Sequence, residues 1–149
     1  MSEHIYKSHN KTLLLYHLVF PAKYRKAIFT PAVEKNFKNI CVGISKRYEI
    51  IFIEIGLDDD HVHFLAQGIP SMTVTQMVKL VKSITAKKIF LAHPKIRKEL
   101  WGGNLWTSGY YANTVGQYAN EDVIKNYVVH QGKKYRRLHR GQLEFDFGC

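Results

Sequence analysis

The hydrophobic and polar positions of the first fifty residues predict a strand followed by a helix. Residues 13–20 are almost continuously apolar and stop at Pro21, as expected for a buried strand. Thr30 and Pro31 then form a typical helix start, with a capping side chain and a proline in the first turn. The apolar side chains that follow recur three and four residues apart as far as Arg47, which predicts an amphipathic helix; they are Val33, Phe37, Ile40, Cys41 and Ile44.

The middle of the chain predicts a β-hairpin and a second helix. Residues 49–57 are rich in isoleucine, residues 58–60 are three aspartates that can make a turn, and residues 61–67 form a second apolar run. Ser71 or Thr73 can cap the next helix, which Pro94 ends. Its apolar face again has helical spacing: Val74, Met77, Val78, Val81 and Ile84.

The last third of the chain predicts one strand and one helix. After a loop at residues 101–103, residues 105–115 have the aromatic and β-branched content of a strand. Asn120 can cap a helix over residues 121–131, with acidic residues in its first turn and Gly132 just beyond its end. The order βαββαβ plus a C-terminal helix predicts an α+β, ferredoxin-like fold with an antiparallel sheet and two helices on one face.

The length of 149 residues suits a single domain, which we place at residues 1–132, followed by a basic C-terminal tail at residues 133–149. Cys41 and Cys149 lie too far apart to form a metal-binding CxxC pair, so we interpret them as free thiols in a reducing compartment. The longest apolar run is far shorter than a membrane span. We therefore expect a cytoplasmic protein with no membrane partner.

The charge of the chain points to nucleic acid as a partner. The 22 Lys and Arg residues outnumber the 12 Asp and Glu residues, which gives a formal net charge of +10 alongside nine Tyr, eight Phe and two Trp. Cations neutralise phosphates and aromatic rings stack on bases. The alternative is that a basic surface is simply tolerated by a cytoplasmic protein.

His61 and His63 are the first candidates for chemistry. Residues two apart on a strand point to the same face, so the two imidazoles would lie side by side and could chelate a divalent metal. Two nitrogen ligands do not make a closed structural zinc site, but they suit a catalytic ion that also binds substrate and water. The alternative is that this face of the strand is solvated and His-x-His has no special role.

Tyr127 and Gln131 are the second pair, four residues apart on one face of the predicted last helix. The amide oxygen of Gln131 can join the two histidines as a metal ligand, and the phenol oxygen of Tyr127 can act as a nucleophile. A phenol with a pKa of about 10 needs a nearby base or cation to react at neutral pH. Alternatively, Tyr127 is an ordinary core aromatic.

These residues lie in four separated motifs, YHLVFPAKYR, DHVHFL, LWTSGYYANTVG and IKNYVVHQ. In this order, and over most of the chain, they resemble the single-tyrosine transposases of the HUH superfamily, which small bacterial and archaeal insertion sequences encode. His61-Val62-His63 matches the signature of that family, and Tyr127 with Gln131 matches its Tyr-x-x-x-Gln helix.

The resemblance implies a metal-dependent enzyme that cleaves and rejoins single-stranded DNA. Tyr127 would be the nucleophile that forms a 5′-phosphotyrosine link, from which a 3′-hydroxyl later rejoins a strand. His61, His63 and Gln131 would hold Mg²⁺ or Mn²⁺. It also implies substrates with DNA hairpins at the element ends, and a homodimer in which the tyrosine helix of one subunit can complete the site of the other.

DNA-contacting residues do not follow from the motifs, so we select them by charge and ring chemistry alone. For each of them a solvated surface position is the alternative. The candidates are Tyr24, Arg25, Lys26, Lys79, Lys82, Lys87, Lys88, Lys133, Lys134, Arg136 and Arg137.

Two other functions fit parts of the sequence. A relative retained by its host could bind structured DNA or RNA repeats as a regulator, with its chemistry dispensable. An RNA-recognition module with a ferredoxin-like fold would need exposed aromatic side chains on its central strands and no metal.

Overall fold

The computed structural model describes residues 3–116 of the chain. The predicted helix at residues 121–131, which contains Tyr127 and Gln131, lies outside the described residues. So does the basic tail at residues 133–149, with four of the DNA-contact candidates.

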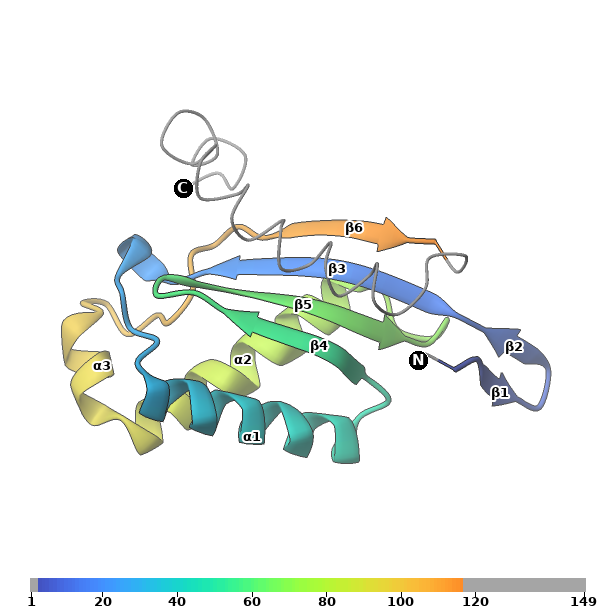
Figure 1. Cartoon of the computed structure of the whole chain (residues 1–149), viewed down its shortest axis with the longest axis horizontal. Helices are drawn as coiled ribbons and strands as arrows, with labels where there is room; N and C mark the ends of the chain where they lie inside the picture. The colour runs from blue at the N-terminus through green and yellow to red at the C-terminus, as the bar shows by residue number, and fades with distance from the viewer. Residues whose placement is uncertain (1–2, 117–149) are drawn as a thin grey trace.

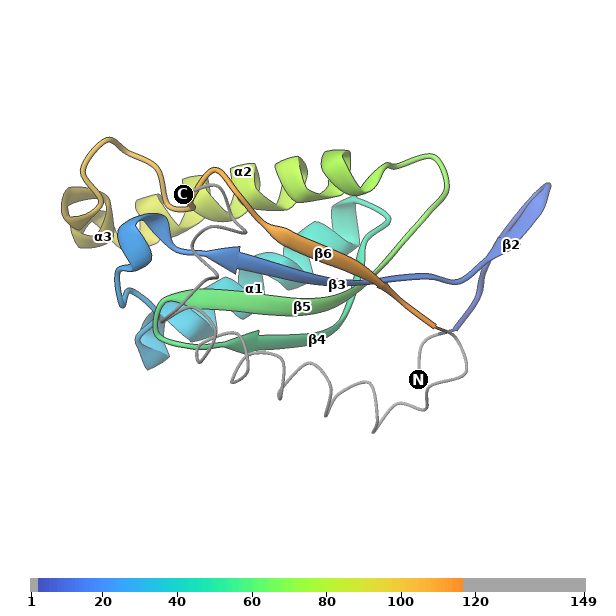
Figure 2. The same cartoon turned by 90° about the horizontal axis from the view of Figure 1, so that it is seen from above.

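The centre of the molecule is a four-stranded antiparallel sheet (Figure 1). The strands are β3 (Leu14–Pro21), β4 (Ile51–Leu57), β5 (His61–Gly68) and β6 (Tyr111–Val115). Their order across the sheet is β4-β5-β3-β6, which Figure 2 shows from above. The two strands that precede the helical connections, β3 and β5, are the central pair, and the ferredoxin-like prediction is confirmed.

Two long helices cover one face of this sheet (Figure 1). Helix α1 (Pro31–Arg47) begins at Thr30, whose hydroxyl accepts a hydrogen bond from the Val33 amide at 3.4 Å. Helix α2 (Val74–Ala92) begins at Thr73, which forms a reciprocal capping box with Gln76. Both starts agree with the sequence prediction.

The core lies between the helices and the sheet. Alternate residues of β5, namely Val62, Phe64 and Ala66, face this core with Phe20 of β3. Phe20 and Phe64 contact each other edge to face at 5.1 Å between ring centroids and are fully buried. Tyr16, the remaining Phe, Tyr or Trp of β3 and β5, also packs against this core. An RNA-recognition module would display aromatic side chains of its central strands to solvent, so this arrangement contradicts that alternative.

The fourth strand begins later than predicted. Residues 105–107 are buried but do not join the sheet ladder, and β6 begins only at Tyr111. Trp106 instead makes an isolated bridge with Ala22, and its indole N–H donates to the Thr85 hydroxyl of α2 at 3.1 Å. The aromatic content that we interpreted as strand propensity therefore reflects packing against a helix.

Several short elements were absent from the sequence prediction. Helix α3 (Pro94–Glu99) follows α2 directly, because the proline that ends one helix also suits the first turn of the next. Strands β1 (Ile5–Lys7) and β2 (Asn10–Thr12) form a hairpin that extends beyond the sheet (Figure 1). A 3₁₀ turn, η1 (Lys23–Arg25), follows β3. Elements this short contain too few residues to produce a hydrophobic period.

The longest helix in the described part of the chain is α2, with 19 residues. It carries four lysines, Lys79, Lys82, Lys87 and Lys88.

Within residues 3–116, none of the helices combines the length and the apolar character needed to cross a membrane.

Candidate functional site

His61 and His63 lie side by side on β5, on the face opposite α1 and α2. Val62 and Phe64 point into the helix-covered core, so the two histidines occupy the other face, as the period of the strand predicts. Their ring centroids are 6.1 Å apart. His61 is fully buried and His63 is 5% exposed, which contradicts the alternative of a solvated strand face.

Gly56 of β4 makes room for the His63 ring. The two residues are partners in the β4–β5 ladder. A Cβ atom on residue 56 would lie 2.2 Å from Cε1 and 2.4 Å from Nε2 of His63. No real Cβ atom makes such contacts, so the imidazole occupies the space that a side chain on residue 56 would need.

His61 is held by two carboxylates of the turn that precedes it. Its Nδ1 lies 2.9 Å from Asp60 Oδ1, and its Nε2 lies 3.1 Å from Asp58 Oδ2. The aspartates make the predicted turn, in which the Asp58 amide donates to the His61 carbonyl at 3.0 Å. Sequence reasoning missed the carboxylate contacts, although their signal was present in acidic residues one and three positions before a histidine.

Arg25 extends this cluster. Its Nη2 and Nε lie 3.2 and 3.3 Å from Asp60 Oδ2, so the two Asp60 oxygens face a guanidinium and an imidazole. Arg25 is also a candidate DNA contact by its charge; its side chain is 16% exposed and forms this ion pair, and the DNA contact stays a prediction.

The two histidines differ in protonation. Burial opposes a charge on His61, but the carboxylates of Asp58 and Asp60 outweigh it and raise the pKa of His61. Burial, together with the neighbouring His61, lowers the pKa of His63 to about 4. Burial likewise opposes the charge of Asp60, but His61 and Arg25 outweigh it and lower the pKa of Asp60. At neutral pH His63 is therefore a neutral imidazole, the form that binds metals.

The histidine pair fits one half of a metal site. His63 Nδ1 is buried and has no hydrogen-bond partner in the described part of the chain. A buried nitrogen without a partner is what a site for a bound ion would leave when the ion is absent. His61 has one nitrogen on Asp60, the arrangement that orients metal-binding imidazoles. Within residues 3–116, however, no three His, Cys, Asp or Glu side chains are grouped closely enough to hold an ion. The third ligand that sequence analysis predicted, Gln131, lies outside the described residues.

A third histidine, His17, lies on the same face and was not among the predicted site residues. It belongs to β3, and its ring centroid is 6.5 Å from that of His63 and 5.9 Å from that of Tyr111. Burial lowers its pKa to about 4, although a hydrogen bond with Asn113 opposes this change. The feature of the sequence that could have indicated His17 as a site residue is its place as the one histidine in the apolar run of residues 13–20.

Tyr24 and Lys26, the other candidates in this loop, are exposed. Tyr24 is 56% exposed, and its hydroxyl donates to the Trp101 carbonyl at 3.2 Å. Because Tyr24 and Arg25 are adjacent, this exposed ring lies close along the chain to the residue that contacts Asp60. Both positions are compatible with the predicted DNA contacts.

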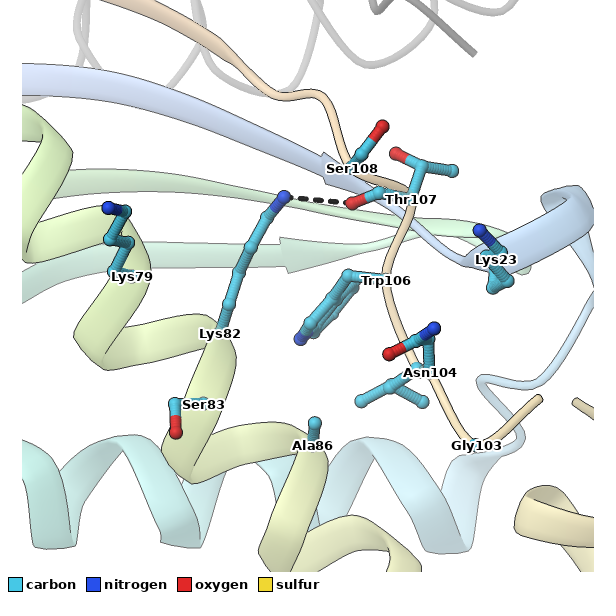
Figure 3. A pocket seen from close by; sticks show the side chains of 11 residues that line it. Lys23, Lys79, Lys82, Ser83, Ala86, Gly103, Asn104, Trp106, Thr107 and Ser108 are labelled. Atoms are coloured by element: carbon cyan, nitrogen blue, oxygen red, sulfur yellow. Dashed lines mark hydrogen bonds between the residues drawn. The ribbon is translucent and has the colours of Figure 1, made fainter.

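The structure separates the four lysines of α2 into two groups. Lys79 and Lys82 line a pocket with Lys23 and the segment at residues 103–108 (Figure 3). Lys82 Nζ donates to the carbonyls of Thr107 and Gly109, both at 2.9 Å, so this ammonium also joins α2 to the segment before β6. Lys87 and Lys88 line a different groove, beside Arg47 of α1.

Comparison with known proteins identifies the class. A family model described as "Transposase IS200 like" matches residues 10–131. The chain belongs to this family of transposases, and the resemblance inferred from the four motifs is confirmed.

Particular relatives support this assignment. The chain is 32% identical over 121 residues to the ISDra2 transposase TnpA of Deinococcus radiodurans, covering 81% of this chain and 86% of that protein. It is 25% identical over 124 residues to the transposase for insertion sequence element IS200 of Salmonella typhimurium, covering 83% of this chain and 80% of that protein. The crystal structure of a transposase from D. radiodurans matches with a TM-score of 0.70 and 28% identity, covering 85% of this chain and 97% of that one. Membership of this family indicates an enzyme that processes DNA.

Proposed function

We propose that the protein is a metal-dependent transposase that cleaves and rejoins single-stranded DNA through a covalent bond to Tyr127. The observation that carries the proposal is the buried pair His61 and His63, side by side on a central strand, in a chain of the IS200-like transposase family. A buried pair of imidazoles on the sheet face opposite α1 and α2 is difficult to explain by packing alone, because His63 Nδ1 has no hydrogen-bond partner within the described residues.

His61, His63 and Gln131 are the proposed ligands of Mg²⁺ or Mn²⁺. Such an ion would polarise a phosphoryl oxygen and withdraw negative charge as it develops on the phosphate. His63 contributes a neutral imidazole whose ring lies over Gly56. His61 contributes a ring that Asp60 contacts at Nδ1, and its Nε2, which lies 3.1 Å from Asp58 Oδ2, is the nitrogen that would bind the ion.

Tyr127 is the proposed nucleophile. Its phenol oxygen, after loss of its proton, attacks the phosphorus of a phosphodiester, and the bond to the 3′-oxygen breaks. The products are a 5′-phosphotyrosine and a free 3′-hydroxyl, which takes up a proton. Attack by another 3′-hydroxyl on the phosphotyrosine reverses the chemistry and releases Tyr127. The energy of the phosphodiester is thus retained and no nucleotide cofactor is needed.

The proposed substrate is single-stranded DNA with hairpins at the ends of the insertion sequence. The proposed DNA contacts of the described residues are Tyr24, Arg25 and Lys26 after β3, and Lys79, Lys82, Lys87 and Lys88 on α2. The tail candidates Lys133, Lys134, Arg136 and Arg137 complete the set. We further propose a homodimer, in which the tyrosine helix of one subunit can complete the metal site of the other.

Formation of a covalent adduct tests this function. Single-stranded oligonucleotides that cover the DNA on both sides of the gene are incubated with protein and Mn²⁺, and adducts are detected by denaturing electrophoresis. We expect an adduct with the wild type, none with Tyr127→Phe, and a normal yield with the control Tyr6→Phe, whose ring is 70% exposed on β1.

Two outcomes would argue against the proposal. An undiminished adduct from Tyr127→Phe would contradict the choice of nucleophile. Hairpin binding by the wild type with no adduct under any metal condition would instead favour a host-retained relative that binds structured repeats as a regulator.

A further inference from the structure

Backbone hydrogen bonds join the turn between β4 and β5 to the segment that follows β3. The Ala22 amide donates to the Asp60 carbonyl at 2.8 Å, and the Phe29 amide donates to the Asp59 carbonyl at 3.1 Å. Two loops, whose residues Arg25 and Asp60 are 35 positions apart in sequence, therefore form one unit at this end of the sheet. A side chain from the first loop can be held accurately against a side chain from the second.

The backbone of Arg25, the residue that contacts this turn, has a conformation that is rare for residues other than glycine. Tyr24 and Arg25 have φ values of 58° and 53°, in the left-handed region that favours glycine. Non-glycine residues persist there only when surrounding contacts require it, and such positions concentrate at functional sites. Here the contacts are an Arg25 amide that donates to the Ala22 carbonyl at 2.9 Å and a guanidinium on Asp60.

The resulting contacts run from guanidinium to carboxylate to imidazole. Arg25 contacts Asp60 Oδ2 through two nitrogens, which anchors this oxygen and leaves Oδ1 for the imidazole. The other oxygen, Asp60 Oδ1, lies 2.9 Å from His61 Nδ1. A proton on Nδ1 leaves Nε2 as the nitrogen able to bind a metal, and Asp58 is the carboxylate beside it, at 3.1 Å.

We propose that Asp60, held in place by Arg25, is a positioning residue that orients the His61 ring with Nε2 toward the metal. This inference rests on the proposed function, since it assigns a role to residues that support a proposed ligand. It also gives Arg25 a task other than the DNA contact predicted from its charge. Asp59, in the same turn, has an exposed side chain and serves as the matched control.

Two measurements on the full-length protein test the proposal. The first is Mn²⁺ affinity without DNA, by electron paramagnetic resonance titration, which a DNA contact of Arg25 cannot affect. The second is the ¹H–¹⁵N signal of His61 Nδ1–H in metal-free protein with ¹⁵N-labelled histidine, assigned by its loss in His61→Gln. This signal reports the contact with Asp60 directly and does not depend on activity.

We expect Asp60→Ala to weaken Mn²⁺ binding roughly ten- to hundredfold and to abolish or shift the Nδ1–H signal. Arg25→Gln should change both readouts in the same direction by a smaller factor, and Asp59→Ala should change neither. If Asp60→Ala does not fold, Asp60→Asn and Arg25→Gln take its place.

Wild-type Mn²⁺ affinity in Asp60→Ala would overturn the proposal, and so would weaker binding with an unchanged His61 signal. If the wild type itself binds no Mn²⁺, the proposed metal site fails. The His61 signal then decides separately whether Asp60 orients the ring.

Discussion

At the scale of single residues, the two histidines of β5 are placed by opposite means. His63 has its position because Gly56 leaves space for the ring, whereas His61 has its position because Asp60 and Asp58 contact its nitrogens. The first ring is neutral and the second favours its proton. A metal ion bound by the pair, as proposed, would therefore meet one neutral ligand and one that must first release a proton.

Gly56→Ala tests the first arrangement. The added methyl group would collide with the His63 ring at 2.2 Å, so the imidazole must move. A displacement of about 1 Å in a catalytic group can cost a hundredfold in rate, and we expect a fall of at least tenfold in the rate of adduct formation. Mn²⁺ titration should show weaker binding in parallel.

The control is Gly43→Ala in α1, where a Cβ atom would meet nothing within 4 Å. This change should raise the free energy of unfolding by up to about 1 kcal/mol and leave the Mn²⁺ affinity unchanged. Normal Mn²⁺ affinity in Gly56→Ala would show that the His63 ring does not need this space.

His17 gives a prediction about pH. Its pKa falls from 6.5 to about 4 on folding because the ring is buried. A group whose pKa is depressed in the native state binds its proton more readily when unfolded, so it reduces stability as the pH falls below 6.5. Between pH 7 and 4.5 the loss from this one group is about 2 to 3 kcal/mol.

Urea unfolding of metal-free protein at both pH values provides the measurement. His17→Leu should lose less stability on acidification than the wild type, by about the amount assigned to the imidazole. Equal losses in the two proteins would mean that His17 is protonated in the native state.

At the scale of elements, local signals predicted the two long helices better than they predicted the last strand. Thr30 and Thr73 cap α1 and α2 as expected, because a cap and a three-and-four spacing are properties of one short segment. Residues 105–110 were assigned to the last strand on content alone, and content reports burial as well as pairing. Tertiary contact with α2 determined the outcome there.

The Trp106 contact can be tested against the second tryptophan. Trp106 is 6% exposed and packs among Phe20, Phe29 and Phe37, whereas Trp101 is 82% exposed. Trp106→Ala should lower the free energy of unfolding by about 3 to 5 kcal/mol, and Trp101→Ala should change it by no more than about 0.5 kcal/mol. Denaturant unfolding followed by circular dichroism measures both. Similar losses in the two variants would contradict the assignment of residues 105–107 to the core.

At the scale of the whole molecule, the sequence predicted the topology and half of the site geometry. The ferredoxin-like order and the shared face of His61 and His63 follow from element order and from the period of a strand. The roles of Gly56 and Arg25 could not be predicted, because they depend on the β4–β5 register and on a contact between residues 25 and 60. The fold puts α1 and α2 on one sheet face and the histidines on the other, where the proposed chemistry would take place.

The central claim is that this chain joins itself to DNA through Tyr127 at a site that contains His61 and His63. Its most direct test is mass spectrometry of the covalent product formed by wild-type protein with a single-stranded substrate and Mn²⁺, after digestion with trypsin and nuclease. We predict a nucleotide phosphate on the peptide that contains Tyr127, and no such product from the His61→Ala/His63→Ala double variant. A nucleotide attached to any other residue, or an undiminished yield from the double variant, would contradict the claim.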